Sequence, residues 1–274
     1  MEYRFTVHAH TDAVDGKSSA KQMVEAALAR KMAAIGFTEH APQRVDARYG
    51  MTDEAEARYI AEIRALQAEY AGRIAIHLGV ERDAFSHADR SKYEYILGSA
   101  HYIDCPGFGV VAVDGQPERL RDMIDRCFGG DGTAMAAAYF QVLGDYVSDY
   151  RPDVIGHFDL VTKHNEDGSL LVAYSTAYLR AAIVALERCL PSGAALEINT
   201  GAISRGYRSQ PYPSQPLLNA WREMGGCVTI GTDSHHADTV DAYFDAAVAW
   251  ARRAGYRSVR ALGTDGLFLD VNID

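Results

Sequence analysis

This sequence lacks the features that would place it in a membrane or in a secreted, disulfide-stabilised class. No run approaches the roughly 20 apolar residues that a bilayer-spanning helix needs, and the first residues contain no apolar stretch of signal-peptide length. The four cysteines are scattered without a CxxC motif, which favours reduced core thiols over a disulfide framework. From these absences we expect a soluble, cytoplasmic protein with no membrane partner.

Positive charge is also scarce. The chain has 27 Lys and Arg against 37 Asp and Glu, which gives a formal net charge of -10. Because a chain with this charge repels a polyanion, the composition argues against nucleic acid as a partner. A small anionic substrate remains compatible with the sequence if metal ions or arginines meet its charge locally. The sequence carries no signal for an oligomeric state.

No internal repeat or low-complexity linker divides the chain, so we expect a single domain over residues 1–274. Strand-like apolar runs alternate with helical patterns along the sequence, which predicts parallel strands joined by helical crossovers. Seven such units favour an α/β fold with a closed barrel. An open doubly wound sheet is the alternative, but its usual GxGxxG loop is absent after the first strand, which ends in His8-Ala9-His10.

The predicted elements cover most of the chain. Strands are expected where short apolar runs occur, at 4–7, 34–38, 74–80, 95–99, 154–156, 195–198 and 228–231, with a short last strand at 268–271. Helices are expected where apolar residues recur at helical spacing, at 18–31, 52–70, 117–128, 133–150, 176–189, 216–224 and 238–254. Ser18 or Ser19 should cap the first helix, and Thr52 the second.

Residues of metal-ligand type follow almost every predicted strand at its carboxyl end, where barrels gather their catalytic residues. Two histidines separated by one residue on an extended segment point their rings to the same side. The candidate ligands are His8, His10, Asp15, His40, Glu81, His101, His157, Asp233 and His235. This set exceeds the needs of one four-coordinate ion and suits two or three ions that share bridging carboxylates. Imidazole and carboxylate together are compatible with Zn, Fe or Mn.

Two cationic residues are candidates for binding a phosphate. Arg205 lies in a polar, glycine-bearing loop after the sixth predicted strand, and a guanidinium can grip a phosphate with two parallel hydrogen bonds. Lys163 follows His157 closely. The alternative for each is an ordinary solvated side chain. Glu39, beside His40, is a candidate for supporting a ligand rather than binding an ion.

Several short motifs resemble the PHP (polymerase and histidinol phosphatase) superfamily. The opening run and the five motifs that resemble the family are Phe5-Thr6-Val7-His8-Ala9-His10-Thr11, Ile35-Gly36-Phe37-Thr38-Glu39-His40-Ala41-Pro42, Gly79-Val80-Glu81, Gly98-Ser99-Ala100-His101-Tyr102, Gly156-His157-Phe158-Asp159-Leu160 and Gly231-Thr232-Asp233-Ser234-His235. Glu197-Ile198-Asn199-Thr200, Arg205 and Pro211-Tyr212-Pro213-Ser214 resemble its histidinol-phosphate phosphatase branch.

The resemblance implies a distorted (β/α)7 TIM-like barrel with a trinuclear metal centre at the carboxyl ends of the strands. It implies one ion held by His8, His10, Glu81 and Asp233, a second held by Glu81, His101 and His157, and a third held by Asp15, His40 and His235. Glu81, Asp233 and His235 would be catalytic, and Arg205 and Lys163 would meet the substrate phosphate.

The function implied is a metal-dependent phosphomonoesterase that hydrolyses L-histidinol phosphate to L-histidinol and phosphate, in histidine biosynthesis, by attack of a metal-bridging hydroxide. One alternative is a phosphatase or phosphodiesterase of the same superfamily that acts on another small phosphate ester or on a nucleotide. A second alternative is a non-catalytic, metal-stabilised scaffold. Such a scaffold would be expected to lack some ligands, and this chain lacks none of the implied set.

Overall fold

A seven-stranded parallel sheet forms the centre of the computed structural model, which describes residues 3–264 and 266–274. Its strands lie in the order β1-β2-β3-β4-β7-β8-β9. They are β1 (Phe5–Thr6), β2 (Ala34–Phe37), β3 (Ala75–Asp83), β4 (Tyr95–Ser99), β7 (Val154–Ile155), β8 (Ala195–Asn199) and β9 (Val228–Gly231). Each of the seven predicted strands is therefore present, within a few residues of its expected bounds.

The sheet closes on itself between its first and last strands. The amide of Val7 donates to the carbonyl of Ile230 at 3.1 Å, and the amide of Asp233 donates to the carbonyl of His8 at 3.0 Å. All residues of β2, β4, β8 and β9 are buried, as expected for parallel strands that are covered on both faces. The predicted barrel of seven parallel strands is confirmed.

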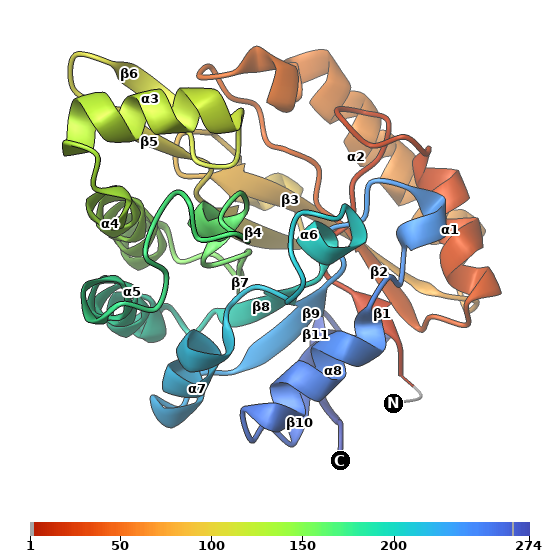
Figure 1. Cartoon of the computed structure of the whole chain (residues 1–274). Helices are drawn as coiled ribbons and strands as arrows, with labels where there is room; N and C mark the ends of the chain where they lie inside the picture. Colours follow the sequence, from red (N-terminus) through yellow and green to blue (C-terminus); the bar gives the residue numbers. More distant parts are fainter. Residues whose placement is uncertain (1–2, 265) are drawn as a thin grey trace.

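Helices surround the barrel (Figure 1). They are α1 (Ala20–Ala29), α2 (Asp53–Glu69), α3 (Pro117–Phe128), α4 (Gly132–Tyr150), α5 (Thr176–Cys189), α6 (Gly201–Ser204), α7 (Gln215–Glu223) and α8 (Phe244–Arg253). The first two begin where the sequence indicates. The hydroxyl of Ser19 accepts from the amide of Gln22 at 3.3 Å, and that of Thr52 accepts from Ala55 at 3.2 Å, so each cap satisfies an amide that the helix leaves free.

Two antiparallel hairpins lie outside the barrel sheet. The first joins β5 (Tyr102–Cys105) to β6 (Gly109–Ala112), and the sequence pattern did not predict it. The second pairs β10 (Ser258–Leu262) with β11 (Phe268–Asn272). The short last strand is therefore present, with a partner that the pattern missed.

The structure corrects two expectations. The helix predicted over 238–254 is divided, because Tyr243 adopts a left-handed backbone with φ of 58° and α8 begins only after it. A left-handed residue cannot continue a right-handed helix. The four cysteines were expected to be reduced, but Cys105 and Cys127 form a disulfide that ties β5 to α3, whereas Cys189 and Cys227 are free.

Over residues 3–264 and 266–274, no helix combines the length and the apolar character that crossing a bilayer would require.

Candidate metal centre

All nine predicted ligands gather at the carboxyl ends of the barrel strands. His8 and His10 follow β1, His40 follows β2, and Glu81 lies near the end of β3. Asp15 lies in the loop that leads to α1. The remaining members follow later strands of the barrel and are His101, His157, Asp233 and His235. All of them except His8 line a cavity of about 910 Å³, and His8 is fully buried outside that lining. A cavity of this size accommodates a small molecule.

Glu81 is the centre of the cluster. Its Oε1 lies 2.9 Å from Nε2 of His157 and 3.4 Å from Nε2 of His101. Its Oε2 lies 3.0 Å from Nδ1 of His40 and 3.6 Å from Nε2 of His8. The side chain is 1% exposed. A carboxylate whose two oxygens face different sets of imidazoles has the arrangement needed to bridge two ions.

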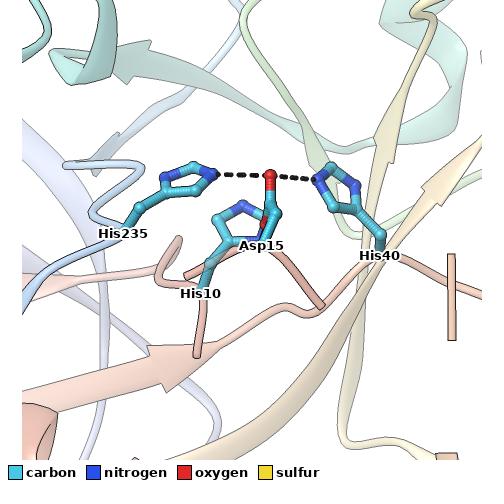
Figure 2. Close-up of side chains that lie close together, drawn as sticks. All are labelled: His10, Asp15, His40 and His235. Carbon is cyan, nitrogen blue, oxygen red and sulfur yellow. Dashed lines mark ion pairs between the residues drawn. The ribbon is translucent and has the colours of Figure 1, made fainter. Parts of the chain in front are cut away.

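A second group forms around Asp15 (Figure 2). The Oδ2 of Asp15 lies between two imidazoles, 3.3 Å from Nε2 of His235 and 3.7 Å from Nε2 of His40. His10 lies beneath them, with its ring stacked on that of His235 at a centroid distance of 4.2 Å. Asp15 lies in a loop, and the structure brings it to the same place as the other predicted ligands.

The grouping differs in part from the one that the resemblance implies. Potential ligand atoms lie within 4.8 Å of one another in three sets: His10, Asp15, His40 and His235; His8, His10 and Asp233; His8, Glu81 and His157. His10 therefore belongs to two sets, because its Nε2 faces His8 at 3.0 Å while its Nδ1 faces Asp15 at 3.9 Å. His101 stands beside the third set through its contact with Glu81.

Burial and mutual contact shift the pKa values of the cluster in opposite directions. Burial by itself would raise the pKa of Glu81, but His101 and His40 hold it well below its usual range. Burial, and after it His235, lowers the pKa of His10 to about 3. Burial would lower the pKa values of His40 and His101, but the Glu81 carboxylate raises both. Ligation by these rings therefore requires the loss of a proton, because only a neutral imidazole offers a lone pair.

The donor set fits a bound cation. Buried polar atoms normally have a hydrogen-bond partner, yet four atoms of the cluster have none. They are Oε2 of Glu81, Nδ1 of His10, Oδ1 of Asp15 and Nδ1 of His157. Unused lone pairs of carboxylates and imidazoles in one buried place are what divalent transition ions bind.

The two predicted cationic residues both line the cavity. Arg205 is tied to the cluster, because it donates to Oδ2 of Asp233 at 2.9 Å and to the carbonyl of Asp233 at 2.8 Å. Its guanidinium has more N–H groups than these contacts use. Lys163 is paired with Asp114 at 3.1 Å and lies 4.9 Å above the ring of Tyr207. Arg205 therefore contacts a proposed ligand directly, whereas Lys163 is engaged by Asp114.

Sequence reasoning named Glu39 as a candidate for supporting a ligand, but it missed Asp83. Oδ2 of Asp83 lies 3.2 Å from Nδ1 of His101 and accepts a hydrogen bond from the backbone amide of His101 at 2.6 Å. Two residues after Glu81 on a strand, Asp83 points to the same side as the ligand, and this was the available signal. Glu39 lies 3.9 Å from Nδ1 of His10, too far for a hydrogen bond to that ring, and its Oε1 accepts instead from the amide of Thr11. Burial raises the pKa of Glu39 to about 8.

The chain is similar to a known protein family and to several named proteins. A family model described as the PHP domain matches residues 6–201. A Deinococcus radiodurans protein named probable histidinol-phosphatase is 29% identical over 252 residues, which cover 87% of this chain and 88% of that protein. A Bacillus subtilis protein named histidinol-phosphatase is 26% identical over 250 residues, 82% of this chain and 90% of its own length.

One solved structure has the same fold over nearly the whole chain. It is that of histidinol phosphate phosphatase from Lactococcus lactis, solved with zinc, L-histidinol and phosphate, and it aligns with a TM-score of 0.70 at 22% identity over 96% of this chain and 98% of that one. At this level of identity the likeness shows the fold alone.

Proposed function

This chain belongs to the PHP domain family, and from that membership we propose that it is a metal-dependent phosphomonoesterase that hydrolyses L-histidinol phosphate to L-histidinol and inorganic phosphate. The observation that carries the proposal is the cluster of six histidines and three carboxylates at the open end of a barrel, beside a cavity of about 910 Å³. Relatives named histidinol-phosphatase that align with most of the chain support the choice of substrate.

We assign the ligand role to the nine clustered residues, with two or three divalent ions of Zn, Fe or Mn as cofactors. The unpartnered lone pairs of Glu81, His10 and Asp15 support this assignment. When bound, such ions lower the pKa of a water molecule and neutralise charge on phosphoryl oxygens. Glu81, Asp233 and His235 face the cavity, and we assign them the catalytic roles, because they lie where the reacting group would meet the cluster.

Arg205 is the proposed phosphate-binding residue. Its contacts with Asp233 hold the guanidinium at the rim of the cluster, so the N–H groups that remain can donate to a phosphoryl oxygen that enters the cavity. Preorganised donors of this kind stabilise charge that grows in the transition state. Lys163 is the second candidate, and its pairing with Asp114 means that it must reorient to reach a phosphate.

The proposal includes a cytoplasmic, small-molecule reaction without nucleic acid or membrane as partner. The charge of -10 supports the exclusion of nucleic acid. The cavity does not by itself separate L-histidinol phosphate from another small phosphate ester or a nucleotide, and this remains the competing enzymatic function. A non-catalytic, metal-stabilised scaffold is the competitor from another class.

A substrate panel at defined metal content tests the proposal. We expect kcat/KM for L-histidinol phosphate to exceed that for sugar phosphates and mononucleotides, and hydrolysis in heavy-oxygen water to place one solvent oxygen in the released phosphate. A higher kcat/KM for a nucleotide or sugar phosphate would assign the chain to the competing phosphatase function. A protein that binds ions but hydrolyses no member of the panel would be a scaffold.

A further inference from the structure

Glu197 is a buried carboxylate that touches two of the proposed ligands without lining the cavity. It lies on β8 and is 0% exposed. Its Oε1 lies 2.7 Å from Nδ1 of His8. Its Oε2 accepts two hydrogen bonds, from the amide of His157 at 2.7 Å and from Nδ2 of Asn199 at 3.0 Å. The Glu197 side chain therefore contacts the ring of His8, which follows β1, and the backbone of His157, which follows β7.

The barrel leaves room for this side chain at one specific point. Gly231 ends β9, the strand between Glu197 and His8 in the sheet order. A Cβ atom at Gly231 would lie 1.8 Å from Oε1 of Glu197, so a side chain there would displace the carboxylate from its contact with His8. The absence of a side chain at residue 231 is therefore what allows Glu197 to reach across β9.

The hydrogen bonds decide which nitrogen of His8 carries the proton. A carboxylate oxygen can only accept, so Nδ1 of His8 must donate to Glu197. When the ring is neutral, as a metal ligand must be, its lone pair is on Nε2, which faces Nε2 of His10 at 3.0 Å and Oδ1 of Asp233 at 3.7 Å. Ligating histidines commonly have their other nitrogen held in this way by a carboxylate.

We propose that Glu197 is a positioning residue that fixes the tautomer and orientation of His8 and, through the amide of His157, the place of a second ligand. The inference rests on the ligand roles proposed above for these two histidines. It assigns no contact between Glu197 and the substrate, because Glu197 lies outside the cavity lining.

Glu197→Gln is an informative substitution because it keeps the shape and changes one acceptor into a donor. The oxygen of the amide should remain opposite the two N–H groups of His157 and Asn199, since an NH2 group there would face two donors. The NH2 group then faces Nδ1 of His8, which must accept. His8 would carry its proton on Nε2, where it points at the cluster and blocks ligation.

The experiment measures Zn²⁺ affinity by competition with a chelator, together with thermal unfolding of the metal-free and Zn²⁺-loaded full chain. We expect Glu197→Gln to weaken Zn²⁺ binding by about 10–100-fold and to reduce the rise in Tm that Zn²⁺ produces. Glu56→Gln is the matched control, because Glu56 is 6% exposed and bonded to Lys92 and Tyr93, away from the ligands. It should leave Zn²⁺ affinity unchanged.

A second readout needs no variant. Nitrogen NMR of the Zn²⁺-loaded wild-type protein should show His8 protonated at Nδ1, with Nε2 free of a proton. A His8 proton on Nε2, or a Glu197→Gln protein that loses stability but binds Zn²⁺ as the wild type does, would overturn the inference. Failure of the proposed function has a different signature, namely a wild-type chain that binds no Zn²⁺ at all or binds it and hydrolyses no phosphate ester.

Discussion

Oε1 of Glu81 lies 2.9 Å from Nε2 of His157, across a gap of 76 residues in the sequence. The pair joins β3 to the end of β7 at the centre of the cluster. Because the other oxygen of Glu81 faces His40 and His8, this one carboxylate contacts imidazoles on both of its sides. The proposed site therefore depends on Glu81 more than on any single histidine.

Glu81→Gln should abolish most of the activity while leaving the barrel folded. The amide cannot supply the negative charge that two ions would share, and the loss should exceed the roughly 10–100-fold cost of removing a supporting residue. Steady-state kcat/KM and metal content per chain measure this, with Glu56→Gln as the buried control. Retention of full metal content and near-normal kcat/KM in Glu81→Gln would refute the central role of this carboxylate.

Removal of metal should remove activity and lower stability together. Six histidines and three carboxylates lie close enough to bind ions, and a ligand that binds only the folded chain stabilises it by about 2.7 kcal/mol at a concentration 100 times its Kd. Dialysis against a chelator should therefore lower Tm and abolish phosphate release, and Zn²⁺ or Mn²⁺ should restore both. Activity that survives complete chelation would contradict metal dependence.

Arg205 should matter more to activity than Lys163. Arg205 touches Asp233 and lines the cavity, whereas Lys163 is held by Asp114. We expect Arg205→Ala to lower kcat/KM by about 100-fold, comparable to the loss of one donor to a developing oxyanion. Lys163→Met should have a smaller effect. Arg205→Lys tests whether charge alone suffices, and the reverse order of the two residues would show that the phosphate enters on the Lys163 side.

Reduction of the disulfide between Cys105 and Cys127 should destabilise the chain. The two residues are separated by 22 positions, and closing a loop of this length in the unfolded chain is worth about 3 kcal/mol. Urea unfolding with and without a thiol reductant measures the difference. Cys189→Ser should keep the sensitivity to reductant, because Cys189 is free. A count of four free thiols in the folded, unreduced protein would contradict the bond.

The barrel strands were predictable from the apolar runs, and most of the proposed ligands follow such a run directly, so their gathering at one end of the fold was predictable too. His8, His40 and His157 could be assigned to that end from strand order alone. The contact of Glu197 with His8 could not, since it crosses Gly231, a relation between β8 and β9 that the sequence does not display. The pairing of Cys105 with Cys127 likewise depends on how α3 packs against the unpredicted β5–β6 hairpin.

The hydrogen bond from Val7 to Ile230 has a consequence for biosynthesis on the ribosome. It joins the first strand of the barrel to the last strand of the barrel. His8 and His10 can therefore meet Asp233 and His235 only after more than 220 further residues have been synthesised. Incomplete chains that stop before β9 would hold only part of the ligand set. Catalytic competence should therefore appear in one step once β9 and the loop after it have emerged, and fragments left by premature termination or by cleavage before residue 228 should be inert.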